Sequence, residues 1–257
     1  MSDFNVKNKV VQSNDFIQLS KWNLNAVPLK IFKTLISCID TLHPPKDNMI
    51  SISKGELFNM IGSESDGGYD YLKRKIKELQ KTSITISEPN REIFVPLVNK
   101  IIWNKDDDNI TCRFDEYLMP YLIDLQERFL QYDVASLKNF KSKYGVILYE
   151  YLLSMARQEQ SQTEHPRYTY TIPMAEFRRL TDTENKLKDM KNFKRRVVEA
   201  SVNDINQSCV EFLVKATSDG SRGKETTKWT FYLRKRTSVT ETNYDIVARP
   251  EWIHRPI

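Results

Sequence analysis

The residues best suited to do chemistry in this chain are a run of basic and amide side chains at positions 186–196. Six of these eleven residues are Lys or Arg, and one is acidic. An α-helix turns once every 3.6 residues, which places the apolar residues of this stretch and its continuation on one face. That face comprises Leu187, Met190, Phe193, Val197, Ser201 and Ile205. The opposite face carries Lys188, Asn192, Arg195, Arg196 and Glu199, and Lys191 flanks it.

This outward face has the chemistry that base recognition needs. A guanidinium such as that of Arg195 or Arg196 offers paired donors to guanine, and the amide of Asn192 can pair both ways with adenine. The pattern predicts a helix that reads base edges in a major groove. An ordinary solvated amphipathic helix has the same pattern and remains the alternative.

A basic hairpin is expected after this helix. The segments 210–214 and 229–233 read as strands, and the polar residues 217–224 form the tip between them. Arg222, Lys224 and Lys228 of this hairpin are expected to contact backbone phosphates. Such contacts position a protein on DNA and make its affinity depend on salt.

The elements that must position these residues occur twice, about 120 positions apart. Residues 52–60 correspond to residues 172–180, and each segment is followed by a polar break and a longer amphipathic helix. The apolar residues of the two longer helices correspond in order, Tyr69, Leu72, Ile76 and Leu79 to Met190, Phe193, Val197 and Ala200. A strand, a short helix, a turn, a longer helix and further strands make a winged helix. The sequence predicts an α+β fold of two tandem winged-helix domains, each a helix-turn-helix with a β-hairpin wing.

The domain boundaries follow from this repeat. We place the N-terminal domain at residues 1–131, the C-terminal domain at 132–236 and a tail without a clear pattern at 237–257. In the first domain we expect a mobile segment at 1–14, helices at 28–42, 69–81 and 115–130, and strands at 84–86, 93–103 and 110–114. In the second we expect a helix at 143–158, a strand at 168–172 and the helix-turn-helix at 174–207.

The first copy carries a weaker basic face. Arg74, Lys77 and Lys81 share one side of the helix at 69–81, but Asp70 and Glu78 dilute their charge. Phosphate contact and a protein–protein role are both open for this helix. Residues 1–130 hold 17 Lys and Arg against 18 Asp and Glu, whereas residues 131–257 hold 22 against 16. The second domain is therefore expected to make the stronger contact with a polyanion.

Several classes of function are disfavoured by what the sequence lacks. Cys38, Cys112 and Cys209 are too scattered for a disulfide framework or a zinc site, and neither a phosphate-binding glycine loop nor a paired-His motif is present. The acidic triplet 106–108 is interpreted as a hairpin turn, because consecutive side chains in a strand alternate in direction. We expect no catalytic residue, no metal and no cofactor. The N-terminus does not resemble a signal peptide and no apolar run approaches the roughly 20 residues that span a membrane, which predicts a soluble cytoplasmic protein.

A set of short motifs, taken in order, resembles one known family. The motifs are Ser13-Asn14-Asp15-Phe16, Pro28 to Phe32, Phe129 to Tyr132, Ser142-Lys143-Tyr144 with Leu148 to Leu153, and Phe193 to Arg196 leading to Asp204-Ile205-Asn206. From about Val10 to Leu233 the chain resembles the replication initiator (Rep) proteins of iteron-containing bacterial plasmids. The family has Glu-Ile-Asn in the last motif, so Asp204 is a conservative departure.

The resemblance implies a function that composition alone does not. The C-terminal winged helix would bind direct repeats, or iterons, in double-stranded DNA at a plasmid origin, and the N-terminal one would contact DNA backbone and support dimerisation. A homodimer in equilibrium with the monomer would repress its own promoter. Host DnaA and the replicative helicase would be its partners. The protein would be bacterial, cytoplasmic and associated with a plasmid. The alternatives are a winged-helix transcriptional regulator, a nicking or priming enzyme, and a structural dimerisation protein.

Overall fold

The structure is a computed structural model that describes residues 2–5, 7–41, 43–61, 68–162, 168–209, 211–221 and 224–236. The chain divides into two compact units, Met1–Lys138 and Asn139–Ile257. Among the helices in the described ranges, none is long and apolar enough to cross a membrane. Both units mix helices with antiparallel sheets, as the predicted α+β class requires.

Unit 1 contains two small sheets in addition to the sheet of its winged helix. Its elements are β1 (Lys9–Ser13), α1 (Asn14–Leu19), β2 (Ser20–Lys21), α2 (Ala26–Ile36), η1 (Lys46–Asn48), β3 (Met49–Ser53), α3 (Lys54–Ile61), α4 (Gly68–Gln80), β4 (Ser83–Glu88), β5 (Arg91–Pro96), β6 (Val98–Trp103), β7 (Asn109–Phe114), η2 (Met119–Tyr121), β8 (Phe129–Asp133) and η3 (Val134–Leu137). The strand orders are β1-β8, β2-β4-β5 and β3-β7-β6.

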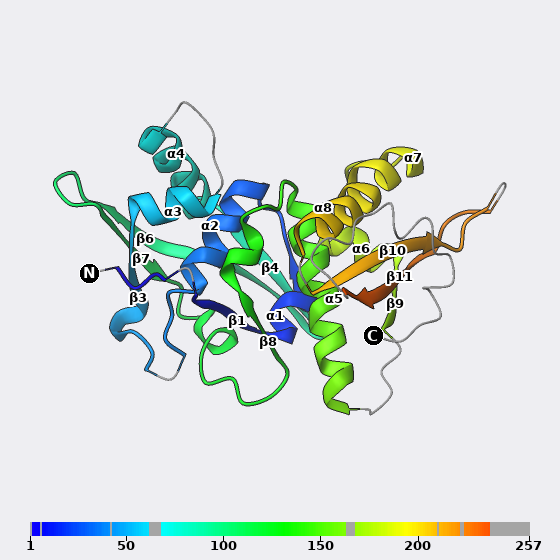
Figure 1. Ribbon diagram of the computed structural model, residues 1–257, viewed down its shortest axis with the longest axis horizontal. Coiled ribbons are helices and arrows are strands. Elements are labelled where there is room, and N and C mark those ends of the chain that lie inside the picture. The colour runs from blue at the N-terminus through cyan, green and yellow to red at the C-terminus, as the bar shows by residue number, and fades with distance from the viewer. Residues whose placement is uncertain are drawn as a thin grey trace. The chain divides into compact units, whose positions relative to one another are not determined.

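Unit 2 is simpler, with one three-stranded sheet. Its elements are α5 (Lys143–Gln162), β9 (Thr169–Pro173), α6 (Met174–Leu180), α7 (Met190–Phe193), the π-helical turn η4 (Lys194–Glu199), α8 (Ala200–Ser208), β10 (Phe212–Ser218) and β11 (Lys228–Lys235). The segments α7, η4 and α8 form one continuous helix, called the 190–208 helix below (Figure 1). The strands β10 and β11 extend from the body of the unit as a hairpin, the wing (Figure 1).

The two units confirm the predicted repeat of winged helices. In each unit a helix is followed by a strand, two further helices and a hairpin whose second strand pairs with that first strand. Thus β7 lies between β3 and β6, and β11 lies between β9 and β10. Unit 1 differs because the hairpin β4–β5 is inserted between α4 and its wing, and pairs with β2 in a separate sheet.

Aromatic side chains fix the helices of unit 2 against its sheet. Phe177 of α6 contacts Phe193 at a centroid distance of 5.5 Å and Phe231 of β11 at 5.7 Å, both edge to face. All three rings are essentially buried. Burying a side chain of this size stabilises the folded state by roughly 1.5–3 kcal/mol, and edge-to-face contacts add to that. The 190–208 helix is therefore held by the same cluster that holds α6 and the wing sheet.

Three predictions about unit 1 are wrong. Residues 115–130 are not a helix, because Asp115 begins a tight turn, η2 contains Pro120, and β8 pairs with β1. That pairing also orders residues 9–13, which we expected to be mobile, and buries Val10 completely. The run 93–103 is two strands rather than one, since β5 pairs with β4 while β6 pairs with β7.

The predicted domain boundary between residues 131 and 132 lies before the division between the two units, which falls between Lys138 and Asn139. It falls inside β8, which belongs to unit 1 through its pairing with β1. The following turn η3 contacts α2, and Lys30 of α2 donates a hydrogen bond to the backbone oxygen of Lys138 at 2.7 Å. Because of these contacts unit 1 extends to Lys138, and unit 2 begins at Asn139.

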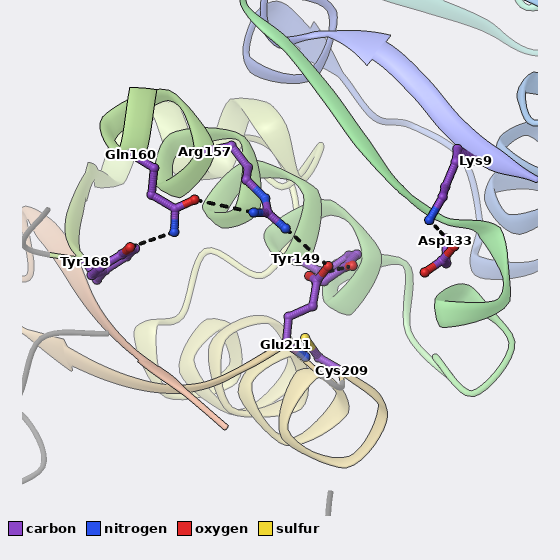
Figure 2. A network of polar contacts seen from close by, with 8 residues as sticks. All are labelled: Lys9, Asp133, Tyr149, Arg157, Gln160, Tyr168, Cys209 and Glu211. Atoms are coloured by element: carbon purple, nitrogen blue, oxygen red, sulfur yellow. Dashed lines mark hydrogen bonds and ion pairs between the residues drawn. The ribbon is translucent and has the colours of Figure 1, made fainter. Parts of the chain in front are cut away.

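A polar network ties α5 to the strand β10 within unit 2. Glu211, next to β10, accepts a hydrogen bond from the Tyr149 hydroxyl at 3.2 Å and lies 3.8 Å from the Arg157 guanidinium (Figure 2). Gln160 donates to the Tyr168 hydroxyl at 2.6 Å. The same picture shows the ion pair between Lys9 and Asp133 that spans β1 and β8 of unit 1. The two ion pairs join partly exposed groups, so each contributes little to stability by itself.

Candidate nucleic-acid interface

The predicted basic helix begins later than the sequence suggests. Its first residue is Met190, and the Asp189 carboxylate accepts a hydrogen bond from the backbone N–H of Asn192 at 2.9 Å, which caps the helix. Lys188 therefore lies in the turn before the cap and not on the helix face, which corrects its predicted position. The side chain of Lys188 is exposed.

Leu187 also lies before the cap, whereas the predicted apolar and polar faces are found on the helix itself. Phe193, Val197, Ser201 and Ile205 are buried, whereas Lys191, Arg195 and Arg196 are exposed and Asn192 is half-buried. Arg195 donates to the side-chain oxygen of Asn192 at 3.2 Å, so these two groups lie side by side on the outer surface. The helix thus presents two guanidinium groups and one amide to solvent, which are the groups that can recognise base edges.

A π-helical turn interrupts the regular period in the middle of this helix. Residues 194–199 form η4, and Val198 is buried beside Val197. The wider turn shifts the residues that follow it, which is why two consecutive valines reach the core. Sequence periodicity does not predict such a turn. Its only trace in the sequence is one apolar residue more than the regular period requires.

The wing of unit 2 carries two of the three predicted phosphate-contacting residues in the described part of the chain. Lys224 and Lys228 are exposed, and Arg222 lies outside the described residues. Asp219 lies where the strands of the wing end and the loop at its tip begins. Its carboxylate accepts hydrogen bonds from the hydroxyl of Thr227 at 2.5 Å and from the backbone N–H groups of Thr227 at 2.9 Å and Lys228 at 3.1 Å. The side-chain hydrogen bond from Thr227 is the main cause that lowers the pKa of Asp219 to about 2.

A pH dependence of the wing follows from this contact. Because the pKa of Asp219 is lower in the folded state, its stabilising contribution is present above the ordinary pKa and is lost as the pH falls towards about 2. We expect the carboxyl carbon of Asp219 to titrate by NMR with a midpoint near the lowered value, and the amides of Thr227 and Lys228 to exchange faster as it does. Asp219→Asn should show the faster exchange already at neutral pH. A midpoint at the ordinary Asp value would contradict the geometry of this turn.

The N-terminus of α5 adds residues that the sequence analysis did not assign to this surface. Burial lowers the pKa of Lys143, and the nearby positive charge of Lys186 lowers it further, while Asp182 opposes this. Burial raises the pKa of Tyr144 on the same helix, and the positive charges of Lys186 and Arg196 act against this rise. The start of α5 is therefore close to the turn and the basic face of the 190–208 helix. The motif Ser142-Lys143-Tyr144 was the available signal, but it gave no indication of where these residues point.

The basic face of unit 1 is formed by α4. Arg74 and Lys77 are exposed on this helix, Lys81 follows its last residue, and all three line a shallow surface hollow. Glu78 lines the same hollow, but its carboxylate accepts hydrogen bonds from Lys75 and Asn25, each at 2.8 Å. Burial tends to raise the pKa of Glu78, yet these hydrogen bonds outweigh it and the pKa is lowered. Lys73 and Asp70 line the hollow as well, so it combines four cations with two carboxylates, and the three predicted cations are among them.

The wing of unit 1 has the opposite charge at its tip. Residues 106–108 are three exposed aspartates between β6 and β7, which confirms that the acidic triplet forms a turn. The Lys54 ammonium, buried beneath the turn, donates to the backbone oxygens of Asn104 at 2.7 Å and Asp107 at 2.6 Å. A negative tip repels phosphate, so this wing is less suited to DNA backbone than the wing of unit 2.

The cysteines are all buried in the interior of their units. Burial raises the pKa of Cys112 to about 12 and of Cys209 to about 11, and it also raises the pKa of Cys38. Thiols of this kind are poor nucleophiles at neutral pH. In the part of the chain that is described, no cluster of His, Cys, Asp and Glu has the composition of a metal site.

The fold and the exposed basic helix define a tandem winged-helix protein of the DNA-binding class. The family described as Initiator Replication protein, WH1, matches residues 9–153, and the one described as Initiator Rep protein, WH2, matches residues 173–233. The chain therefore belongs to the replication initiator (Rep) family with WH1 and WH2 domains. The WH1 match extends past the end of unit 1 into α5.

Individual relatives agree with this assignment. The chain is 22% identical over 203 residues to a replication initiation protein from Escherichia coli, and the match covers 77% of this chain and 61% of that protein. The chain thus spans less than two thirds of the length of this curated relative. The crystal structure of the Pi initiator protein in complex with iteron DNA has a TM-score of 0.69 at 17% identity, covering 91% of this chain and all of that one. This likeness shows a shared fold.

Proposed function

We propose that this protein binds double-stranded DNA sequence-specifically through unit 2 and initiates plasmid replication by binding direct repeats at an origin. The observation that carries the proposal is the outer face of Lys191, Asn192, Arg195 and Arg196 on a helix that is capped and packed against α6. Membership of the Rep family supports a role in initiation. The relatives' names, a replication initiation protein and an initiator bound to iteron DNA, support repeats as the target.

The two units would make different kinds of contact with DNA. Unit 2 offers base-reading groups and the cations of its wing, whereas unit 1 offers the cations of α4 beside an acidic wing tip. Phosphate contacts supply most of the sequence-independent affinity, and base contacts supply the specificity. We therefore assign Arg74, Lys77 and Lys81 to backbone contact and the 190–208 helix to recognition.

The proposal is tested by measuring the affinity for a duplex with repeats from the DNA beside the protein's own gene and for a scrambled duplex of equal length. Fluorescence anisotropy at two salt concentrations should show preference for the repeats that survives the higher salt, because base contacts are less screened than phosphate contacts. Equal affinity for both duplexes would contradict the proposal. Cutting of a supercoiled origin plasmid in Mg²⁺ would support a nicking enzyme instead.

Removing one wing cation should weaken binding without changing specificity. Lys224→Ala is expected to lower the affinity for repeat and scrambled duplexes by the same factor and to reduce the salt slope by about 1, because one phosphate contact is lost. Titrations at several salt concentrations give both values. Lys9→Ala provides a control in unit 1, where the ammonium is paired with Asp133. A change in the ratio of the two affinities would show that Lys224 contacts a base.

Dimerisation is part of the proposal, and unit 1 offers a surface for it. In the described ranges, β5 pairs with β4 on one side only, and Phe94 on this strand is 70% exposed. An apolar side chain on an unpaired strand edge is a ready site for pairing with another chain. We infer that the occupant is β5 of a second copy, because two identical edges related by a two-fold axis can form one continuous sheet.

Charging this edge should favour the monomer. Phe94→Lys is expected to raise the dimer dissociation constant by about tenfold or more, since an ammonium would have to be buried or displaced at the interface. Sedimentation equilibrium measures this directly. Tyr117→Lys is the matched control, because Tyr117 is 67% exposed but lies outside the strands. Equal effects of the two substitutions would exclude β5 as the interface.

The later steps of initiation are also part of the proposal. Repression of the protein's own promoter by the dimer, and recruitment of host DnaA and the replicative helicase, are expected from the family. The transcriptional regulator remains the alternative, and it predicts one inverted repeat in the bound DNA instead of several direct repeats.

A further inference from the structure

The Arg178 guanidinium on α6 is engaged by the turn that precedes the 190–208 helix. Its Nη1 donates to the backbone oxygens of Thr183 at 2.9 Å and Lys186 at 3.2 Å. Its Nη2 donates to the backbone oxygens of Leu187 at 3.2 Å and Lys188 at 3.4 Å. The backbone N–H of Thr183 donates in return to the backbone oxygen of Arg178 at 2.8 Å. Four carbonyl groups of one turn thus converge on a single side chain.

The turn itself is in an unfavourable conformation. Asp182 and Leu187 have φ angles of 53° and 51°, in the left-handed region that L-residues with a side chain rarely adopt. Residues 181–189 contain no glycine that would relieve this strain. Backbone strain of this kind persists only where surrounding contacts hold it. The hydrogen bond from Arg178 to the carbonyl of Leu187 acts directly on one of the two strained residues.

The same guanidinium also reaches the first turn of the helix. It lies 4.5 Å from the ring centroid of Phe193, on the helix that carries Asn192, Arg195 and Arg196. Phe193 in turn packs against Phe177, the neighbour of Arg178 on α6. Arg178 therefore connects α6, the turn and the start of the 190–208 helix. Any rotation of this helix about its axis would break several of these contacts at once.

We propose that Arg178 is a positioning residue for DNA recognition, which fixes the starting point and rotation of the 190–208 helix so that Asn192, Arg195 and Arg196 meet the base edges together. This inference rests on the proposed function of that helix. Arg178 acts through the protein rather than through DNA, because its donors are directed at the carbonyl groups of the turn. A planar guanidinium suits these four acceptors, since its donors lie on two separate nitrogens in a fixed plane, whereas the three donors of a lysine ammonium all lie on one nitrogen at the end of a flexible stem.

The substitution Arg178→Lys tests this idea, because it keeps the charge and removes the planar fork. In the full-length protein we expect the ratio of affinities for repeat and scrambled duplexes to fall by about tenfold or more, as for loss of a base contact. Affinity for the scrambled duplex should stay nearly unchanged, because the net charge is conserved. Hydrogen exchange of the free protein should become faster at amides 183–192 and remain unchanged in β10 and β11.

Arg157→Lys is the matched control, since Arg157 is a partly exposed guanidinium of the same unit that contacts Glu211 and Gln160. It should alter neither the affinity ratio nor exchange in the turn. The proposal is overturned if Arg178→Lys keeps the ratio, if both affinities fall together, or if exchange rises throughout unit 2. Wild-type protein without preference for repeats would instead contradict the proposed function, and the exchange measurement would still decide whether Arg178 holds the turn.

Discussion

Replacing Arg195 or Arg196 with alanine is expected to cost roughly 1–3 kcal/mol of binding free energy on the specific repeat and much less on scrambled DNA. Both side chains are exposed on the 190–208 helix, and the guanidinium of Arg195 lies 3.2 Å from the amide oxygen of Asn192. A bidentate contact to a base edge is lost with the guanidinium, whereas a phosphate contact would be lost equally on any sequence. Anisotropy titrations of both duplexes give the two free energies.

The conservative variants separate charge from geometry at these positions. Arg195→Lys and Arg196→Lys keep the charge, so they should keep the salt slope of the wild type while losing most of the specificity. Arg113→Ala removes an exposed arginine from β7 of unit 1 and should leave the specificity ratio unchanged. If the alanine variants at 195 and 196 behave like Arg113→Ala, these residues do not read bases.

The largest effect on stability is expected where α8 meets the start of α5. The Asp204 carboxylate accepts hydrogen bonds from the backbone N–H of Lys141 at 3.0 Å and of Ser142 at 2.8 Å, in an almost fully buried position. Asp204→Ala would leave these N–H groups without their acceptor, at a cost of roughly 1–3 kcal/mol. Gly145→Ala should have a similar effect, because an added Cβ would lie 2.4 Å from Oδ2 of Asp204.

A double-mutant cycle on the full-length protein checks this contact. The two substitutions disrupt one arrangement, so their combined cost in the free energy of unfolding should be clearly smaller than the sum of the single costs. Chemical denaturation monitored by hydrogen exchange in unit 2 gives the three values. Gln207→Ala, at an exposed position of the same helix, should have little effect. Additive costs would mean that Gly145 and Asp204 act independently.

The winged helices could be predicted because their residues follow simple periods. Buried positions such as Leu72, Ile76, Phe193 and Val197 recur at helical spacing, and the same order of elements appears twice. The capping residue Ser53 was also predictable, since it accepts from the backbone N–H of Glu56 while Glu56 accepts from that of Ser53. Helical periods and caps are local features, so the residues that determine each of them lie within one short stretch of sequence.

Two of the features that were missed depend on contacts distant in sequence. The strand β8 is ordered by β1, more than 100 residues earlier, and the break between β5 and β6 reflects their membership of different sheets. The contacts of Arg178 are local, but they could not be predicted because their acceptors are backbone oxygens, which carry no residue identity. The motif Asp204-Ile205-Asn206 was noticed as a resemblance, and its physical basis is the cap of α5 and the bonds of Asn206 to Val214.

The most direct test of the central claim is a DNase I footprint of the full-length protein on the DNA that flanks its own gene. We expect protection of several regularly spaced direct repeats, and loss of that pattern in the combined variant with Arg195→Ala and Arg196→Ala. Protection of one inverted repeat would favour a transcriptional regulator. Uniform protection without a sequence pattern would contradict the assignment of the 190–208 helix as the element that reads DNA.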